Sequence, residues 1–196
     1  MTFDRIYRDN LWNGVESHSG PGSGTTATRN IAKQLTDLVK LLKVESVLNV
    51  GCGDDFWMPD LPGYLGVDVS SEAIDLARKN HPDRFYRLLP PDSPSSVPEF
   101  DLVICRDVLQ HLSQHSATWL VDRMNKIGRL LLLSTYMSVA QGHDIEDGGY
   151  TEPNLMLEPF SLGAPMLLYF DGYQYAEEDP PIRDPRKFLG LWKGRG

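Results

Sequence analysis

The chain of 196 residues has only two cysteines, no long apolar run and little positive charge. Cys52 and Cys105 cannot form a disulfide framework or a zinc site by themselves, and both follow apolar strand-like runs, so we expect reduced core thiols. No apolar stretch reaches the ~18–20 residues of a membrane-spanning helix, and the first ten residues are charged, unlike a signal peptide. We therefore expect a cytoplasmic protein with no membrane contact.

The scarcity of positive charge also narrows the choice of partners. The chain holds 19 Lys and Arg residues against 27 Asp and Glu residues, which gives a formal net charge of −8. Such a balance repels the phosphate backbone of nucleic acids. We expect no nucleic-acid partner, and a small-molecule partner is favoured instead.

Apolar residues recur in a pattern that is typical of an α/β fold. They follow helical spacing between Ala27 and Leu42, which predicts an amphipathic helix. Downstream, strand-like and helical runs alternate: strands are expected at 46–50, 64–69, 84–89, 101–105 and 129–134, and helices near 71–80 and 113–125. The apolar runs of the strands are continuous rather than alternating, which indicates a parallel sheet covered on both faces.

The C-terminal third does not continue this alternation of strands and helices. Glycines and prolines break Met137–Pro165 into a long irregular segment, and such segments are usually functional. Met166–Phe170 and Lys187–Trp192 are expected to pair as an antiparallel hairpin at a sheet edge. The fold prediction is a Rossmann-like α/β protein with a mostly parallel seven-stranded sheet. Residues 1–26 are expected to form an arm with a Gly-rich loop, and residues 27–196 a single domain.

A Gly-x-Gly turn follows the first predicted strand, in the sequence from Ser46 to Asp55. Gly51 permits a sharp turn, and Gly53 would let a ligand approach the backbone without meeting a Cβ. This turn is therefore a candidate nucleoside site. An ordinary strand-to-loop turn is the alternative interpretation.

An acidic residue at the end of the second strand supports the nucleoside site. Asp68 lies 15 positions beyond Gly53, where a carboxylate can accept hydrogen bonds from both ribose hydroxyls of an adenosine ligand. The alternative is that Asp68 caps the following helix, a role that Ser70 or Ser71 would fill equally well.

A third polar cluster follows the strand that ends at Cys105. Arg106, Asp107, Gln110 and His111 are expected at the carboxyl edge of the sheet, where open α/β folds bind their ligands. The alternative is a solvated loop that caps the helix beginning near Ser113.

These motifs, in this order, resemble the class I S-adenosylmethionine-dependent methyltransferases. Val47–Asp55 resembles the family's first motif, Asp68 its ribose-binding acid and Phe100–Leu112 its fourth-strand motif, over roughly residues 27–134. Glu16–Ser23, Arg106–Leu112 and the segment from Asp144 to Phe160 also resemble a small bacterial subgroup. The resemblance implies S-adenosylmethionine as cofactor, bound by Ser19, Gly20, Gly22, Ser23, Asn49, Gly51, Cys52, Gly53, Asp68, Val69, Arg106 and Asp107. No metal is implied.

The sequence departs from the family pattern at two positions. Asn49 stands where the family usually has an acid, and Asp55 stands where it usually has a third glycine. The negative charge facing the sulfonium would then come from Asp54, Asp55 or Asp107. Asp92 is a loose counterpart of the family's adenine-contacting acid.

The resemblance implies an in-line methyl transfer, in which the protein chiefly positions the acceptor. His111, with Asp107 beside it, is the first candidate for a general base, needed for a hydroxyl or ammonium acceptor, and His143 is the second. Backbone N–H groups of Ser19–Ser23 are expected to close over the methionine carboxylate.

The irregular segment Met137–Pro165 is expected to act as the acceptor lid. Its excess of carboxylates suits a cationic amine or guanidine, with an aromatic ring of the segment available for cation–π contact. The candidate acceptor-binding residues are His111, Asp144, Tyr150, Asn154 and Phe160. The pocket is expected to be completed by the arm, by this lid or by a second subunit of a homodimer.

Three functions follow from this interpretation. The first is methyl transfer to an N or O atom of a small molecule. The second is methyl transfer to a peptide or glycan, and the third is a non-catalytic nucleoside-binding paralogue. A nicotinamide-dependent oxidoreductase is disfavoured, because Phe56 stands where the dinucleotide fingerprint has its third glycine.

Overall fold

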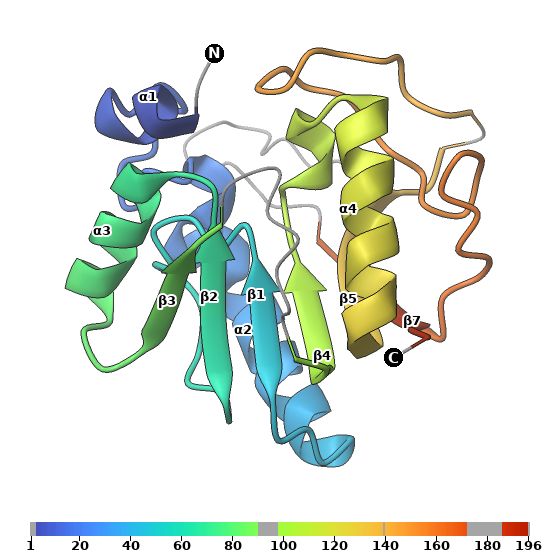
Figure 1. Cartoon of the computed structure of the whole chain (residues 1–196), viewed down its shortest axis with the longest axis horizontal. Coiled ribbons are helices and arrows are strands. Elements are labelled where there is room, and N and C mark those ends of the chain that lie inside the picture. Colours follow the sequence, from blue (N-terminus) through green and yellow to red (C-terminus); the bar gives the residue numbers. More distant parts are fainter. Residues whose placement is uncertain (1–2, 90–97, 139, 172–185, 196) are drawn as a thin grey trace. The chain divides into compact units, whose positions relative to one another are not determined.

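The computed structural model describes residues 3–89, 98–138, 140–171 and 186–195 (Figure 1). The chain divides into two compact units. The first holds the described residues up to 89, including the N-terminal arm, and the second holds those from 98 onward. Asp92 lies outside the described residues, and the single domain expected for 27–196 stays a prediction.

The first unit is built on three parallel strands in the order β3-β2-β1. Its elements are α1 (Phe3–Arg8), η1 (Pro21–Ser23), α2 (Thr25–Leu41), β1 (Val47–Val50), β2 (Tyr64–Asp68), α3 (Ser71–Asn80) and β3 (Phe85–Leu88). Val47 pairs with Tyr64, and Leu65 pairs with Phe85. All four residues of β1 are buried. Figure 1 shows α3 lying along β2 and β3.

Local sequence explains both longer helices of this unit. Ile31, Leu35 and Leu38 fall on the buried side of α2, as the helical spacing predicts. Helix α3 begins after Ser70, whose side chain accepts a hydrogen bond from the backbone N–H of Ala73. Ser70 is therefore the N-cap of α3, and the capping alternative for Asp68 is not needed.

The second unit carries four strands in the order β4-β5-β7-β6. Its elements are β4 (Phe100–Cys105), η2 (Leu109–His111), α4 (Gln114–Ile127), β5 (Gly128–Tyr136), β6 (Leu167–Phe170) and β7 (Lys187–Lys193). Strands β4 and β5 are parallel, whereas β7 runs antiparallel to both β5 and β6. Helix α4 lies along β4 and β5 (Figure 1), and the residues of these strands form the core.

The predicted seven-stranded, mostly parallel α/β fold with an antiparallel C-terminal hairpin is confirmed. Cys52 and Cys105 are both buried and form no disulfide with each other, as expected. Within the described residues, none of the helices has the length and apolar character needed to cross a membrane. Strand β6 stands at one end of the strand order. Its residues Leu167, Leu168 and Phe170 are 40–45% exposed.

Candidate functional site

The Gly51–Asp55 turn of the first unit is tightly wound. Gly51, Gly53 and Asp55 have φ angles of 69°, 59° and 53°, in the left-handed region that glycine adopts without strain. The backbone N–H groups of Gly51 and Cys52 both donate to the carbonyl of Val67, at 2.8 and 3.0 Å. The turn is thus fastened to the end of β2, where Asp68 lies.

Asp68 connects the turn to the start of α3. One carboxylate oxygen accepts from the backbone N–H of Gly53 and the other from that of Ser70, each at 2.9 Å. Burial raises the pKa of this carboxyl. Each oxygen of a carboxylate can accept more than one hydrogen bond, so the group keeps acceptor capacity for a vicinal diol. Val69, beside it, leaves 42% of its surface exposed, so an apolar contact adjoins the polar one.

Asp55 and Asn49 form hydrogen bonds with other side chains of the protein interior. Asp55 accepts from the hydroxyls of Tyr64 and Tyr86, both at 2.6 Å, and from the Arg84 guanidinium at 2.9 Å. Burial raises the pKa of Asp55 despite these donors. The amide of Asn49 donates to the Tyr64 hydroxyl at 2.9 Å. Asp55 therefore does not present an uncompensated charge, which corrects one expectation for the sulfonium. No pattern in the sequence pointed to the two tyrosines and Arg84.

Several backbone N–H groups of the Gly-rich loop donate within the arm itself. Ser19 N–H donates to Ser17 Oγ, and Gly20 N–H to the Ser17 carbonyl, both at 3.1 Å. Ser23 N–H donates to the Gly20 carbonyl at 3.0 Å. Three of these N–H groups therefore have acceptors within the loop, and the closure of Ser19–Ser23 over a carboxylate stays a prediction. Gly22 lies between them in η1.

Side chains of the arm pack closely against Gly53. A Cβ at this position would collide with Ser19 Oγ and would lie 2.7 Å from the Tyr7 hydroxyl oxygen. The space that the missing Cβ leaves is filled by two side chains of the arm. Gly53 is thus required by the arm in this structure, and its contact with a ligand stays a prediction.

Asp107 follows β4 in the second unit with a left-handed φ of 60°. Its N–H donates to Ser134 Oγ at 3.0 Å, and its carboxylate pairs with Lys187 Nζ at 2.6 Å and Arg106 Nη1 at 3.2 Å. Burial raises the pKa of Asp107, but the two cations outweigh burial and lower the pKa to about 2. Asp107 is an anion whose charge is already compensated.

Arg106 is held by a second carboxylate. Its guanidinium donates to both oxygens of Asp171, with Nη2–Oδ1 at 2.8 Å and Nε–Oδ2 at 3.0 Å. The side chains of Arg106 and Asp171 are 2% and 0% exposed. Arg106 is therefore buried directly after β4, where it is held by its pair with Asp171. No spacing in the sequence pointed to Asp171, which follows β6, or to Lys187, the first residue of β7.

His111 occupies η2, directly after this charged cluster. Its Nδ1 lies 2.8 Å from the carbonyl oxygen of Gly149. A carbonyl only accepts, so Nδ1 carries the proton and Nε2 is the acceptor atom of the neutral ring. Burial lowers the pKa of His111, which keeps the neutral form populated near pH 7. These features are those of a general base.

The structure brings His111 and Tyr150 together, as predicted for a common site. Their ring centroids are 5.9 Å apart. The Tyr150 side chain is 51% exposed, and its hydroxyl lies 3.0 Å from that of the buried Tyr136. Two backbone hydrogen bonds hold this part of the irregular segment against η2, from Gly148 to His111 and from Thr151 to Gln110. These hydrogen bonds hold the backbone that carries Tyr150 next to the backbone that carries His111.

Two carboxylates of the irregular segment, Asp144 and Asp147, contact the beginning of α4. Asp144 accepts from the backbone N–H of Gln114 at 2.7 Å. Asp147 accepts from the N–H of Ser113 at 2.7 Å and from the Ser116 hydroxyl at 2.9 Å. Both carboxylates sit at the N-terminus of α4, where anions are stabilising. The assignment of Asp144 to the acceptor stays a prediction, and its observed contact is with the helix terminus.

The remaining two predicted acceptor residues are less exposed than Tyr150. Asn154 is 2% exposed; it donates to the Ser138 carbonyl at 2.6 Å and accepts from Met156 N–H at 3.0 Å. These contacts give Asn154 an internal role in the segment. Phe160 is half-buried and lines a cavity of about 20 Å³ together with His143, room for about one water.

Taken together, these features define a Rossmann-like α/β protein in which a buried carboxylate at the end of β2 contacts the glycine turn after β1. Residues 48–129 match the family model Methyltransf_11, described as a methyltransferase domain. The match shows a methyltransferase domain over these residues, which agrees with the family that the sequence motifs resemble, the class I S-adenosylmethionine-dependent methyltransferases. The cofactor of this family is S-adenosylmethionine.

Two solved structures show the same fold. The N-methyltransferase NodS from Bradyrhizobium japonicum WM9, in complex with S-adenosyl-L-homocysteine, is 15% identical with a TM-score of 0.68, over 98% of this chain and 100% of that one. The magnesium protoporphyrin IX methyltransferase ChlM from Synechocystis PCC 6803, with bound SAH, is 18% identical with a TM-score of 0.51, over 70% and 68%.

A third structure, PKMT2 from Rickettsia typhi in complex with AdoHcy, is 24% identical with a TM-score of 0.42. It aligns with 50% of this chain, which spans only 22% of its length. None of the curated proteins compared with the chain matches it.

Proposed function

We propose that the chain transfers a methyl group from S-adenosylmethionine to an N or O atom of a small molecule. The observation that carries this proposal is Asp68, which ties the glycine turn to α3 through Gly53 and Ser70 and keeps acceptor capacity on both oxygens. Bound S-adenosylmethionine supplies an electrophilic methyl group on a sulfonium. The chain's own residues bind it, position the acceptor and take up the acceptor's proton.

The first unit is proposed to hold the nucleoside part of the cofactor. Asp68 would accept from the ribose hydroxyls, and its negative charge disfavours a phosphate on the ribose. The exposed Val69 side chain offers an apolar surface beside it for the adenine. This arrangement supports a nucleoside without a pyrophosphate, in keeping with the absence of the third glycine at Phe56.

The second unit is proposed to hold the acceptor. The hydrogen bond to Gly149 fixes the tautomer of His111, so that Nε2 takes the proton of a hydroxyl or ammonium acceptor. Asp107 lies in the same unit with its charge balanced by Arg106 and Lys187. We therefore assign Asp107 to the support of the site, and His111 to the proton transfer.

The cationic amine or guanidine remains our preferred acceptor, but on a different basis from the one in the sequence. The carboxylates of Asp144 and Asp147 are engaged with α4. The exposed ring of Tyr150, beside His111, is now the group that favours a cation, through cation–π attraction. A small-molecule partner and a homodimer likewise remain proposals, the latter open to sedimentation analysis.

Calorimetric titration tests the proposal. We expect S-adenosylmethionine and S-adenosylhomocysteine to bind the wild type and NAD not to bind. Asp68→Ala should abolish this binding, while the exposed Asp60→Asn should leave it unchanged. Binding of NAD alone would overturn the proposal. Binding without turnover on a panel of amines, guanidines, alcohols, peptides and glycans would instead indicate a nucleoside-binding paralogue.

A further inference from the structure

One carboxylate of the glycine turn collects hydrogen bonds from three consecutive residues of the N-terminal arm. Asp54 accepts from Ser17 Oγ at 2.8 and 2.9 Å, from His18 N–H at 2.8 Å and from Ser19 Oγ at 2.8 Å. Asp54 is 3% exposed. Hydrogen bonds to a carboxylate are stronger than those between neutral groups. Asp54 therefore provides the main hydrogen-bonding contact between the arm and the turn.

The arm residues held by Asp54 reach the loop that carries Gly53. Ser19 gives its proton to Asp54, so in its 3.2 Å contact with the Tyr7 hydroxyl the tyrosine is the donor. Ser19 and Tyr7 fill the space beside Gly53. Gly53 in turn donates its N–H to Asp68. A continuous series of contacts thus runs from the arm, through Asp54 and Gly53, to the proposed ribose acid.

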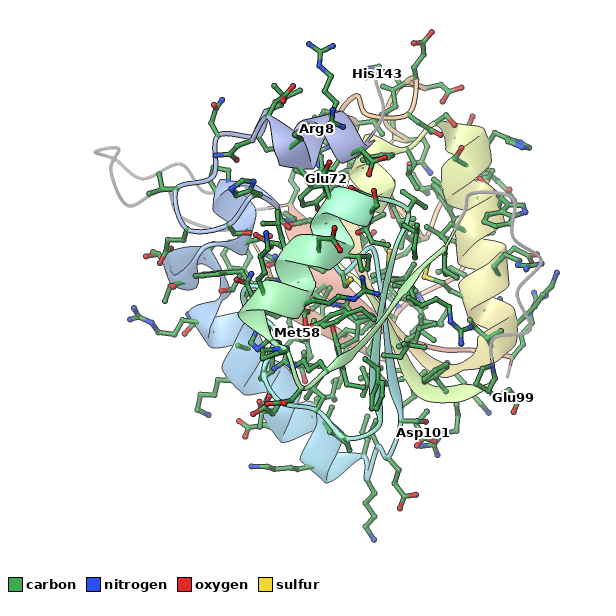
Figure 2. All side chains as sticks on the ribbon, turned by 60° about the vertical axis from the view of Figure 1, so that its left-hand side comes forward. Arg8, Met58, Glu72, Glu99, Asp101 and His143 are labelled. Atoms are coloured by element: carbon green, nitrogen blue, oxygen red, sulfur yellow. The ribbon has the colours of Figure 1, made fainter. Side chains whose placement is uncertain are left out.

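The other polar contacts of the arm are longer or more exposed, and Ile6 and Tyr7 add buried apolar packing. Asp4 accepts from the Ser70 hydroxyl at 2.9 Å, from the Ser71 hydroxyl at 3.3 Å and from Glu72 N–H at 3.5 Å, in a part-buried position. Arg8 and Glu72 form an ion pair at 3.3 Å, with side chains 58% and 42% exposed (Figure 2). Exposed pairs of this kind contribute little to stability. The arm therefore depends on Asp54 more than on its surface contacts.

We propose that Asp54 is a positioning residue for the cofactor: it holds residues 17–19 and Tyr7 against the glycine turn, and thereby keeps the Gly53–Asp68 pair in its binding geometry. This inference rests on the proposed binding of S-adenosylmethionine. It assigns Asp54 a role different from a counter-charge for the sulfonium, because the carboxylate faces donors of the arm. Preorganisation by the arm lowers the cost of ordering the loop when the cofactor binds.

Asp54→Asn provides the sharpest test, because it keeps the shape of the side chain and replaces one acceptor oxygen by a donor. We expect S-adenosylmethionine to bind at least tenfold more weakly and to dissociate faster, measured by calorimetry and stopped-flow fluorescence. Limited trypsin digestion should cleave the variant faster after Arg8. The control Glu72→Gln, which removes only the exposed tether, should change the affinity less than twofold.

A double-mutant cycle separates action through the arm from direct action on the cofactor. In a Ser17→Ala/Ser19→Ala background, Asp54→Asn should cost less than threefold in affinity. A full tenfold loss in that background would overturn the inference, because Asp54 would then act without the arm. If Asp54→Asn fails to fold by circular dichroism, Ser17→Ala and Ser19→Ala alone should still each weaken binding, and normal binding by both would overturn it.

The outcome also distinguishes this inference from the proposed function. A wild type that binds no S-adenosylmethionine contradicts the proposed function. A wild type that binds it, with unchanged affinity in Asp54→Asn, contradicts the positioning role alone.

Discussion

The guanidinium of Arg106 donates to both carboxylate oxygens of Asp171, and neither side chain is more than 2% exposed. The two residues lie 65 positions apart in the chain. Their pairing joins the end of β4 to the residue that follows β6. The strained backbone of Asp107 is thereby held next to an ion pair that water does not reach.

Loss of one partner of this pair should be costly. Asp171→Asn leaves the Arg106 guanidinium buried with too few acceptors, and such changes typically cost about 3–5 kcal/mol. We expect a loss of this size in the free energy of unfolding, measured by urea denaturation. Asp101→Asn, at a more exposed ion pair with Arg129, serves as the control and should cost less than about 1 kcal/mol. Equal losses in the two variants would contradict the buried-pair assignment.

The pKa of Asp107 predicts an acid-sensitive contribution to stability. Its folded pKa of about 2 is below the ordinary value of 3.8. The contribution is therefore present above the unfolded pKa and is lost as the pH falls from about 5 to 2. At neutral pH the contribution of Asp107 to the free energy of unfolding amounts to about 2 kcal/mol. Asp107→Asn should lower the free energy of unfolding at pH 7 and flatten its decline in acid, as followed by urea titrations at a series of pH values.

The acidic limb of the methyl-transfer rate should report His111. Burial lowers the pKa of this ring, and only the neutral form accepts a proton, so the midpoint of the kcat/KM profile should lie below pH 6.5. His111→Gln should remove this limb and lower kcat by about 10²–10⁴-fold. An unchanged profile in His111→Gln would assign the residue to structure. His115→Gln, at the beginning of α4, is the matched control.

The carboxylate of Asp147 should matter for stability and not for the acceptor. Asp147→Ala removes acceptors from Ser113 N–H and the Ser116 hydroxyl. We expect a loss of about 0.5 kcal/mol in the free energy of unfolding, with the KM of the acceptor unchanged. A marked rise in the KM of the acceptor would instead indicate that the acidic segment binds the acceptor. Ser70→Ala, which removes the N-cap of α3, should cost about 1 kcal/mol by the same principle.

Sequence patterns predicted the strands and the positions of Asp68 and His111, because these depend on local periodicity and on the ends of parallel strands. The pairing of His111 with Tyr150 was predicted only as membership of a common site. Partners that are distant in the chain could not be found in this way. Asp54 meets Ser17 across 37 positions, and the sequence shows only that both are polar.

The roles of the acidic residues were the least predictable part of the site. An Asp beside a glycine turn or in a glycine-rich segment suits a ligand, an arm or a helix terminus equally well. The choice depends on which donors the fold brings near. Asp54, Asp55 and Asp144 all found donors within the protein, so the excess negative charge at these positions is largely structural.

The beginning of α4 depends on residues that are synthesised well after it. Ser113 caps the helix locally, but Asp144 and Asp147 supply their carboxylates from 30 or more positions further along the chain. On the ribosome, the first turn of α4 therefore emerges before the anions that complete it. Its full stability is reached only when the irregular segment has left the exit tunnel and docked, which couples the ordering of the helix to that of the segment beside His111.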